Sequence, residues 1–553
     1  MENITINVLG HGEISVPAGT TLGEAAAMVC GNREYPVLIA KVDNDLHELF
    51  RSATAGCEVE FLDVRDTNGF RVYQRSAAFM MVYAAKEVLG RKVRVVVEHS
   101  INKNYYCSIQ HEGIELTEER VAAIEAKMRE TAEKNLPIEK YALPVDEAMR
   151  LSEEYALYDK VRTLKYRRAS NVNFYKLDWL YDYFYGHLAP NTGCIGLFKL
   201  VLAEGGKFIL QMPDRRNPES LNELKPLTRI TKVFQESGAW AAILKADTVG
   251  ALNDIICAGG QGEFVRVNEA LHEKKIASLA DMIHENGKKI VLIAGPSSSG
   301  KTTFAERLGI QLRVNGLIPL VVSLDDYYLD RDATPLDEDG KPDYETVYAL
   351  DIPRINEDFS RLLAGESVRV PSFNFRAGKR EYRRRPISLN EENVLVVEGI
   401  HGLNEKISES IPKESKFKIV ISALTQLNID DHNRIPTSDT RLIRRIVRDS
   451  NYRGFKAEET LAMWPSVLRG EQKFIFPFQE EADAVFNSAL VYELCVLKHY
   501  VEPILFSIPR SRAEYTQARR LVKFLECFVG FPSEEVPANS ILREFIGGSC
   551  FRT

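Results

Sequence analysis

The chain has 553 residues, of which 45% are hydrophobic and 27% charged, so it can bury sizeable cores and is not a disordered protein. A chain of this length predicts roughly three or four domains. The formal net charge of −7 argues against a protein that coats nucleic acid with its whole surface, although a local basic face stays open.

The eight cysteines are widely spaced and include no C-x-x-C pair. This pattern favours reduced thiols over disulfides or a cysteine zinc site. The N-terminus lacks a basic stretch followed by an apolar core, and no apolar run is long enough to span a bilayer. We therefore expect a cytoplasmic protein with no signal peptide and no membrane partner.

The segment 1–65 predicts a small, compact β-grasp-like domain. Residues 4–9 largely alternate between apolar and polar side chains, and 13–17 follow a Gly-His-Gly turn, which is typical of a β-hairpin. Thr21, with Glu24 three residues later, indicates a helix that begins with a capping box. Further strands are expected at 35–42 and 58–62.

Two motifs in this segment, Val-Pro-Ala-Gly-Thr-Thr-Leu-Gly-Glu-Ala-Ala at 16–26 and Val-Glu-Phe-Leu-Asp at 59–63, resemble the TGS domain of threonyl-tRNA synthetases. The likeness continues at 73–79 and 189–200, which resemble the second, editing-type domain of the same family. The resemblance implies an α+β domain over 66–223.

The synthetase family carries a His-Ser-x-x-His pair and a Cys-x-x-x-His pair in that domain. The first pair falls on Arg75 and Phe79, the second falls on Phe184 and Leu188, and His187 lies one residue off. One histidine cannot supply the several converging ligands of a metal or hydrolytic site. We therefore expect this domain to be catalytically inactive, which leaves RNA binding, ligand binding or a dimerisation scaffold (a homo-oligomer) open.

A helical connector is predicted over 224–285, because 231–244 and 269–283 carry apolar residues at three- and four-residue steps. The glycine-rich loop 258–263 between them lacks the lysine and threonine of a phosphate loop, so it predicts a turn. Basic clusters occur at 165–168 and 215–216, for which solvated faces are favoured over RNA contact.

The segment 291–303, Val-Leu-Ile-Ala-Gly-Pro-Ser-Ser-Ser-Gly-Lys-Thr-Thr, contains the phosphate-loop (Walker A) pattern G-x-x-x-x-G-K-[ST]. An apolar strand precedes it and a helix with apolar spacing follows, so backbone N–H groups and a helix N-terminus would meet a phosphate. Lys301 would reach the β- and γ-phosphates, and the Thr302 hydroxyl would hold Mg²⁺. The residues expected to bind the nucleotide are Gly295, Ser298, Ser299, Gly300, Lys301, Thr302, Thr303 and, from a later helix, Arg441.

Two acidic residues follow apolar strands that come after this loop. Asp325 follows the strand 318–324, and Glu398 follows the strand 393–397. Because carboxyl ends of strands line the ligand crevice of a doubly wound sheet, Asp325 is placed to accept a hydroxyl proton and Glu398 to act on Mg²⁺. The alternatives are a helix cap for Asp325 and a surface turn for Glu398.

A dense run of arginines is predicted on a helix at 439–449. Arg441, Arg445 and Arg448 lie four and three residues apart, so they share one helix face. A lid that neutralises phosphate charge would suit phosphoryl transfer, whereas a solvated charged face is the alternative.

Four motifs in order resemble the uridine kinase/phosphoribulokinase family, most of all the uridine–cytidine kinases, over about 290–500. They are Ser-Leu-Asp-Asp-Tyr-Tyr at 323–328, Pro-Ser-Phe-Asn-Phe at 371–375, Val-Glu-Gly-Ile at 397–400, and Asp-Thr-Arg-Leu-Ile-Arg-Arg-Ile-Val-Arg-Asp at 439–449. The resemblance implies a P-loop kinase domain over 286–505, with a doubly wound, mostly parallel sheet and a helical lid, followed by a helical tail over 506–553. It also implies an ATP or GTP donor, Mg²⁺, and a nucleoside 5′-hydroxyl as acceptor.

Carried over by position, Asp325 and Lys301 would be catalytic, together with Arg445 and Arg448 in the lid. The residues that would face the acceptor are Asp325, Tyr328, Glu345, Phe373, Phe375 and Arg453. Phe373 and Phe375 could stack on a base or be core residues.

The chain departs from the family where the nucleoside is bound. Glu345 replaces the ribose-binding aspartate, Phe373 and Gly378 replace the base-contacting tyrosine and histidine, and Phe455 replaces an arginine. Since hydrogen bonds to a base edge discriminate strongly, these changes leave a non-pyrimidine nucleoside or a sugar phosphate open as acceptor. An RNA-binding, translation-linked regulator is the alternative from another class.

The segment 426–437 looks like an insertion relative to the uridine kinases. His432 stands there among polar and charged residues, so we expect it to be exposed and give it no role.

Overall fold

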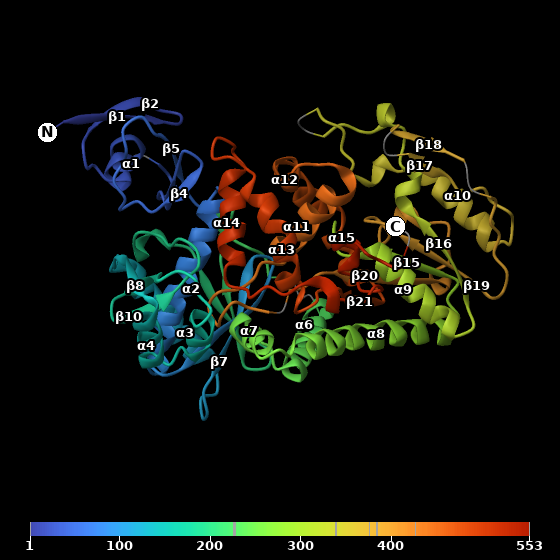
Figure 1. Cartoon of the computed structure of the whole chain (residues 1–553), viewed down its shortest axis with the longest axis horizontal. Helices are drawn as coiled ribbons and strands as arrows, with labels where there is room; N and C mark the ends of the chain where they lie inside the picture. Colours follow the sequence, from blue (N-terminus) through green and yellow to red (C-terminus); the bar gives the residue numbers. More distant parts are fainter. Residues whose placement is uncertain are drawn as a thin grey trace.

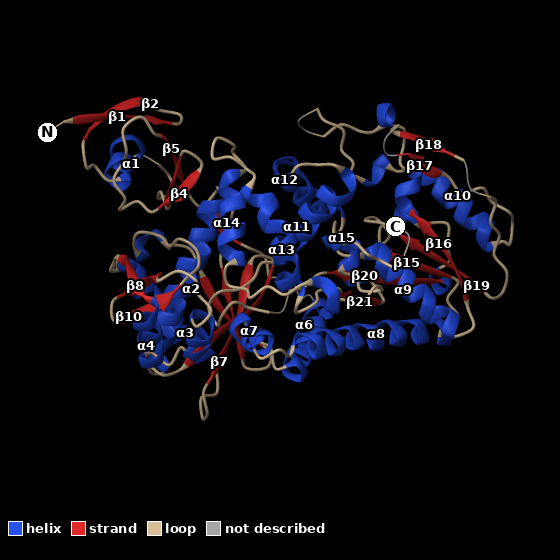
Figure 2. Ribbon diagram, in the orientation of Figure 1, coloured by secondary structure: helices blue, strands red, loops and turns tan. Residues whose placement is uncertain are grey.

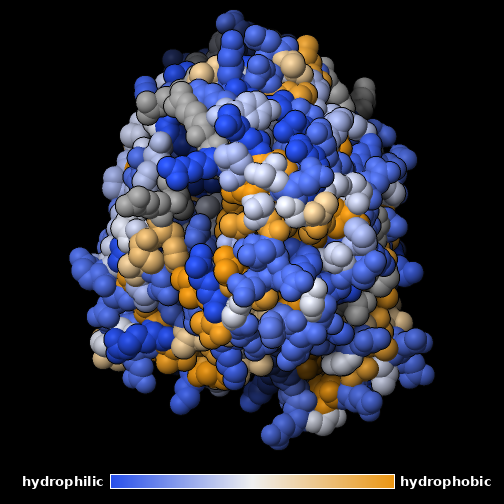
Figure 3. All heavy atoms as spheres, turned by 90° about the vertical axis from the view of Figure 1, so that its right-hand side faces the viewer, coloured by the Kyte–Doolittle hydropathy of each residue, from blue (hydrophilic) through white to orange (hydrophobic). Residues whose placement is uncertain are grey.

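The computed structural model describes residues 2–31, 33–224, 228–337, 340–374, 377–382, 385–425 and 427–551. An N-terminal sheet and, beside it, a second region of sheets and helices lie toward one end of the molecule, a parallel sheet lies toward the other, and helices lie between them (Figure 1). The end with the parallel sheet has a mostly hydrophilic surface on which hydrophobic side chains occur in small groups (Figure 3).

The N-terminal unit is a five-stranded sheet in the order β2-β1-β5-β3-β4, with one helix against it. Its elements are β1 (Asn3–Val8), β2 (Gly12–Pro17), α1 (Leu22–Cys30), β3 (Ile39–Val42), β4 (Asp45–His47) and β5 (Glu58–Leu62). β1 and β2 pair antiparallel, which confirms the predicted hairpin. The Thr21 side chain accepts from the Glu24 backbone N–H while the Glu24 carboxylate accepts from the Thr21 N–H, which confirms the capping box.

The second unit is built around α2 (Thr67–Leu89), which is buried along most of its length. Its other elements are β6 (Arg94–Ile101), β7 (Asn104–Gln110), α3 (Glu118–Glu133), β8 (Ile138–Pro144), α4 (Val145–Glu154), α5 (Tyr158–Leu164), β9 (Asn171–Leu177), β10 (Leu180–Tyr183), β11 (Lys199–Ala203), β12 (Lys207–Gln211), β13 (Pro213–Asp214) and β14 (Asn217–Leu221). The rings of Phe79 and Phe184 lie 5.3 Å apart in its core. Phe79 and Phe184 stand where the resembling synthetase family carries a histidine and a cysteine. Here both side chains pack in the core.

The predicted helical connector is confirmed as α6 (Thr228–Leu244), α7 (Val249–Cys257) and α8 (Gln261–Glu285), with a turn at 258–260 between the last two. The basic cluster at 165–168 contributes to this joint. Lys165 and Tyr166 both donate to one oxygen of Asp254 in α7, Lys165 at 3.1 Å. The Lys165 side chain stays exposed, in keeping with the predicted solvated face, while these contacts join the second unit to the connector.

The C-terminal half contains five parallel strands in the order β16-β19-β15-β20-β21 (Figure 2). Its elements are β15 (Ile290–Ala294), α9 (Lys301–Val314), β16 (Ile318–Ser323), α10 (Ile352–Leu363), β17 (Ser372–Asn374), β18 (Lys379–Glu381), β19 (Asn393–Glu398), β20 (Lys416–Ser422), α11 (Thr437–Arg448), α12 (Ala457–Phe474), β21 (Ala484–Asn487) and α13 (Glu493–Phe506). Ile290 and Leu292 of β15 pack into one core with α10, while Val291 and Ile293 pack into another with α9. The sheet is thus covered on both faces, as predicted.

The tail beyond α13 contains α14 (Tyr515–Leu525) and α15 (Arg543–Ile546). α14 reaches back to the N-terminal sheet, where the Thr516 hydroxyl donates to the Asn44 carbonyl at 2.6 Å. α15 packs against α11. One tail therefore contacts both ends of the molecule.

The segment 427–433, within the expected insertion, is buried against the second unit, so the expectation of an exposed His432 was wrong. His432 is 4% exposed, and its Nδ1 lies 2.7 Å from an oxygen of Asp182. Asp430 lies 2.9 Å from the ammonium of Lys160, and Asp431 accepts from Arg94 at 2.7 Å. We call Lys160, Asp182, Asp430 and His432 the buried latch, because they hold the kinase-like half against the second unit.

Candidate functional site

The loop between β15 and α9 has a backbone that its glycines permit. A β-carbon at Gly295 would overlap the carbonyl oxygen of Ile421 in the neighbouring strand. Gly300 caps α9 with φ at +85°, and Ser298 has φ at +60°. Left-handed backbone at two positions turns the chain sharply from strand to helix.

The loop gathers donors that have no acceptor. The hydroxyls of Ser298, Ser299 and Thr303 are buried without a hydrogen-bond partner among the described residues. Among the described residues, the Lys301 ammonium finds hydrogen-bond acceptors only in the loop's own carbonyls, of Gly295 at 3.1 Å and Pro296 at 3.4 Å. Because buried polar groups are normally paired, these donors suit a phosphate-bearing ligand.

The two predicted acids lie at the carboxyl ends of neighbouring strands. Ser323, the last residue of β16, is in register with Glu398, the last residue of β19. The Ser323 hydroxyl donates to Glu398 at 2.9 Å and accepts from the Asp325 backbone N–H at 3.3 Å. One serine therefore positions both acids beside the phosphate loop.

Both acids lie in surroundings that disfavour their charge. Burial raises the pKa of Asp325, and burial together with the Asp325 charge raises the pKa of Glu398 to about 7. A divalent cation would relieve this repulsion, and Mg²⁺ characteristically uses one or two carboxylates and keeps several waters. The residues present therefore suit Mg²⁺, which Glu398 and the Thr302 hydroxyl would hold.

The arginines of α11 contact the phosphate loop from outside. Arg441 is buried in an ion pair with Glu471 at 2.7 Å and donates to the Ser297 carbonyl at 3.2 Å. Arg445 donates to the Ser297 hydroxyl at 2.9 Å and pairs with Asp449 at 3.2 Å. Arg441 thus supports the loop backbone, and its direct contact with a nucleotide stays a prediction.

The remaining lid arginines gather around one carboxylate. Arg448 lies 2.9 Å and Arg453 3.7 Å from Asp449. Arg445, Arg448 and Arg453 therefore share a partner that phosphates could replace, which fits the arginine-rich lid but leaves its closure a prediction.

The acceptor side is a wall of aromatic residues with one acid. The Tyr328 ring lies 5.8 Å from the Phe373 ring, and its hydroxyl donates to the Tyr344 carbonyl at 3.0 Å. Burial raises the pKa of the neighbouring Glu345 to about 7. Tyr328 and Phe373 are thus brought together, whereas Phe375 lies outside the described residues.

Three contacts on the loop come from residues that sequence patterns did not single out. The Glu471 carboxylate accepts from the Ser297 backbone N–H at 3.2 Å. Glu544 of α15 accepts from the Thr303 N–H at 3.2 Å, and Ile541 packs so closely that a β-carbon at Gly300 would overlap it. The motif match ends well before the tail, so no local signal points to Glu544 or Ile541.

Residues 290–493 match the model of the Phosphoribulokinase / Uridine kinase family. A uridine kinase of Lactobacillus johnsonii is 28% identical over 197 residues, which cover 35% of this chain and 84% of the relative. A solved structure described as a possible uridine kinase from Bacillus stearothermophilus covers 38% of this chain and 97% of its own, at 19% identity and a TM-score of 0.26. A TM-score of this size does not establish a common fold, so the fold rests on the strand order above.

A threonine–tRNA ligase of Syntrophotalea carbinolica is 27% identical over 186 residues, which are 34% of this chain. The chain spans only 29% of the length of that relative. The TGS and editing assignments of the N-terminal half therefore stay predictions. In the part of the chain that the structure describes, no helix combines the length and the apolar character needed to cross a bilayer.

The C-terminal region is thus a domain of the phosphoribulokinase/uridine kinase family. This is a family of kinases, so the region is a kinase-family domain.

Proposed function

We propose that the protein is an ATP- and Mg²⁺-dependent kinase that phosphorylates the 5′-hydroxyl of a nucleoside. A uridine- or cytidine-like nucleoside is the first candidate for the acceptor. The placement of Asp325 and Glu398 at adjacent strand ends beside the phosphate loop carries this proposal. A bare nucleotide switch has no need of a carboxylate poised toward an acceptor. No observation on the described residues favours GTP as donor.

In the proposed reaction, an acceptor hydroxyl attacks the γ-phosphorus in line with the bond to the leaving ADP. As the new O–P bond forms and the old one breaks, the hydroxyl proton passes to a carboxylate oxygen of Asp325. The raised pKa of Asp325 makes it a stronger base than an ordinary aspartate. Mg²⁺ held by Glu398 and the Thr302 hydroxyl would supply charge neutralisation, and Lys301, Arg445 and Arg448 would add to it from the protein side.

Acceptor recognition is proposed to rest on Tyr328, Phe373 and Glu345. The two rings offer faces on which a base could stack, and Glu345 offers oxygens to a ribose hydroxyl. Stacking discriminates less strongly between bases than hydrogen bonds to their edges do. A non-pyrimidine nucleoside or a sugar phosphate therefore remains the alternative acceptor.

A panel of nucleosides and sugar phosphates, assayed for acceptor-dependent ADP release, tests the proposal. We expect one class of nucleoside to accelerate ADP release and to yield a 5′-monophosphate by mass spectrometry. Release of ADP without any acceptor, accelerated instead by tRNA, would contradict the kinase and favour an RNA-linked regulator.

Asp325→Asn should retain ATP binding and lose about 10²- to 10⁴-fold in turnover, because the proton acceptor is removed. Asp332→Asn is the matched control, since Asp332 is an exposed acid in the same connecting loop. Unchanged turnover in Asp325→Asn would contradict the assignment of the base while leaving the reaction class standing.

A further inference from the structure

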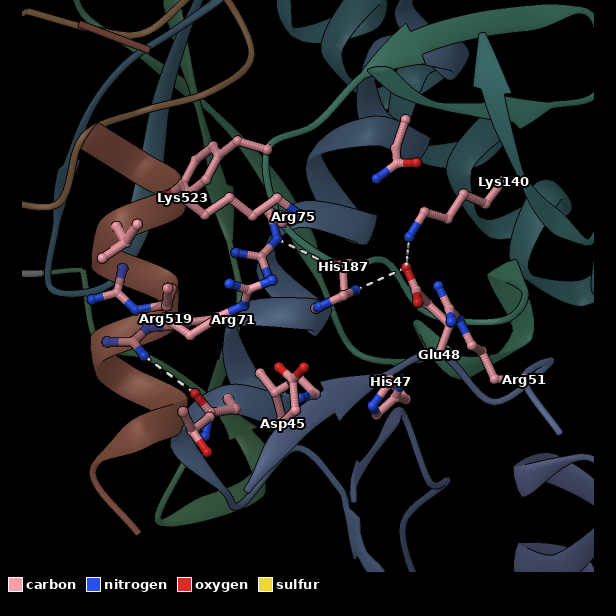
Figure 4. Close-up of a pocket in the computed structure, with 18 of the residues that line it drawn as sticks. Asp45, His47, Glu48, Arg51, Arg71, Arg75, Lys140, His187, Arg519 and Lys523 are labelled. Atoms are coloured by element: carbon pink, nitrogen blue, oxygen red, sulfur yellow. Dashed lines mark hydrogen bonds and ion pairs between the residues drawn. The ribbon is translucent and has the colours of Figure 1, made fainter. Parts of the chain in front are cut away.

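A cavity of about 350 Å³ lies far from the phosphate loop, where three parts of the chain meet (Figure 4). The loop after β4 closes one side, α2 and β8 of the second unit form the floor, and α14 of the tail forms the other wall. No residue of the phosphate loop, of α11 or of the acceptor wall lines it. It is therefore a separate site.

The cavity wall is strongly cationic. Seven lysine or arginine side chains and three carboxylates line it. One of these carboxylates, Glu48, is already engaged, because it pairs with Lys140 and lies 2.8 Å from Nδ1 of His187. Figure 4 shows this group on one side of the cavity and Arg71, Arg75, Arg519 and Lys523 on the other.

Three cations on that second side make no direct contact with a described carboxylate, although the charges of Asp439 and Glu48 act on two of them. Arg71 donates to the side-chain oxygens of Gln517 at 3.1 Å and Asn68 at 3.3 Å, and Arg75 donates to the His187 carbonyl at 3.0 Å. Among the residues that the structure describes, Arg71, Arg75 and Lys523 form no ion pair with a carboxylate. Burial, reinforced by neighbouring cations, lowers the pKa of Lys523 to about 8 and that of Arg71 to about 10.

The backbone is shaped to admit one of these cations. The Arg75 guanidinium lies against Gly186, where a β-carbon would overlap its central carbon. Glycine at this position therefore allows Arg75 to lie along the cavity wall. Arg75 also stands where the resembling synthetase domain carries a histidine. A side chain that could bind a metal or transfer a proton is thus replaced by one that keeps its positive charge.

Unpaired cations crowded into a cavity cost free energy unless an anion joins them. Guanidinium groups match phosphate oxygens in geometry, and lysine serves as an additional point charge. Three or more uncompensated cations exceed what one phosphate would balance, and the cavity has room for a larger group. We propose that this cavity binds a small molecule carrying two or more phosphate groups.

Binding is tested by titrating inorganic pyrophosphate calorimetrically into the full-length chain carrying Lys301→Ala, which weakens the phosphate loop as a competing site. We expect one binding event, weakened at least tenfold by adding Arg71→Gln and Lys523→Gln, because charged hydrogen bonds are lost. Adding Arg512→Gln is the matched control, since Arg512 lies in the same tail but only forms a surface ion pair with Glu458. It should change affinity less than twofold.

Thermal unfolding separates a ligand site from a structural one. Without ligand, Lys523→Gln should unfold at the same or a higher temperature than the wild type, because it removes an unpaired cation. Pyrophosphate should raise the unfolding temperature of the Lys301→Ala chain, and that rise should shrink when Lys523→Gln is added. Absent binding, or binding indifferent to Arg71→Gln and Lys523→Gln, would overturn the proposal, as would a Lys523→Gln chain that unfolds several degrees lower.

Discussion

The phosphate loop and the basic cavity both gather groups that suit phosphate, but they balance charge in opposite ways. Around the loop, Lys301 has Asp325 and Glu398 nearby, and Arg445 pairs with Asp449. In the cavity, Arg71, Arg75 and Lys523 form no ion pair among the described residues, and the nearby Glu48 is already engaged by Lys140 and His187. The loop site thus suits an anion that brings its own cation, whereas the cavity suits an anion alone.

A third group of charges shows what a purely structural arrangement looks like. In the buried latch, the Lys160 ammonium lies 2.9 Å from both Asp182 and Asp430, and all three are fully buried. Each charge there has a partner within the protein. The missing partners in the cavity therefore distinguish it from an ordinary internal ion cluster.

Removing divalent metal should have the largest effect and should separate the two sites. We expect EDTA to abolish ADP release, since the loop site needs a cation between its acids and the phosphates, and added MgCl₂ to restore it. Pyrophosphate binding to the cavity should persist in EDTA, as followed by calorimetry. Turnover that survives EDTA would show that the loop site needs no divalent cation, and this difference between the two sites would disappear.

Lys160→Met should destabilise the folded protein by about 3–5 kcal/mol, because it leaves Asp182 and Asp430 buried without a counter-charge. Urea unfolding followed by intrinsic fluorescence measures the loss. Lys199→Met, which changes an exposed lysine of the same unit, should stay within about 0.5 kcal/mol. A small effect at Lys160 would show that the buried latch does not stabilise the fold, so the contrast between its paired charges and those of the cavity would fail.

The acids of the loop site predict a dependence on pH. Because the pKa of Glu398 is raised from 4.5 to about 7, the folded protein binds more protons than the unfolded chain within that window. The ligand-free protein should therefore lose stability, by about 3 kcal/mol at most, as pH rises from 4.5 to 7. Turnover should rise as the pH increases, since Asp325, whose pKa is raised by burial, must be ionised to accept a proton.

The unfolding temperature measured against pH checks this expectation. Glu398→Gln cannot ionise, so its curve should be flatter than that of the wild type and should lie above it at pH 8. Parallel curves would show that Glu398 does not carry the dependence.

Glu544→Gln should have the smallest effect. The Glu544 carboxylate accepts from the Thr303 N–H at the start of α9, where nucleotide phosphates are expected, so it should repel them. Its removal should lower the KM for ATP by up to about fivefold, corresponding to about 1 kcal/mol. A raised KM would show instead that the tail helps to hold the nucleotide.

Much of the donor side could be predicted because its signals are local. The loop pattern needs only the consecutive residues 295–302, and an apolar strand places the acid at its end beside that loop. The hairpin and the capping box at Thr21 are equally local, and both are present. The parallel sheet followed from apolar runs of strand length, because β15 and β19 are buried along their whole length, although Ile318 and Val321 of the edge strand β16 are exposed.

Predictions failed where polar residues find distant partners. His432 stands among polar neighbours in the sequence, which favours exposure. In the structure it is buried, with the Asp182 carboxylate and the Val95 carbonyl as hydrogen-bond partners. Asp254 likewise bonds to Lys165 and Tyr166, a contact that the sequence did not reveal, although the Lys165 side chain stays exposed as predicted. A sequence pattern shows that a side chain is polar. It does not show which distant residue will stabilise that side chain in the interior.

By itself the sequence determined a phosphate-loop kinase domain and the strand ends that carry Asp325 and Glu398, and it predicted that Arg75 and Phe79 stand where the resembling synthetase family carries histidines. Each of these is written in short motifs or in residues at matching positions. Only the tertiary structure decided that α14 closes a cationic cavity and that Glu544 reaches the phosphate loop. Those contacts join segments hundreds of residues apart, and such pairings depend on how whole units pack against one another.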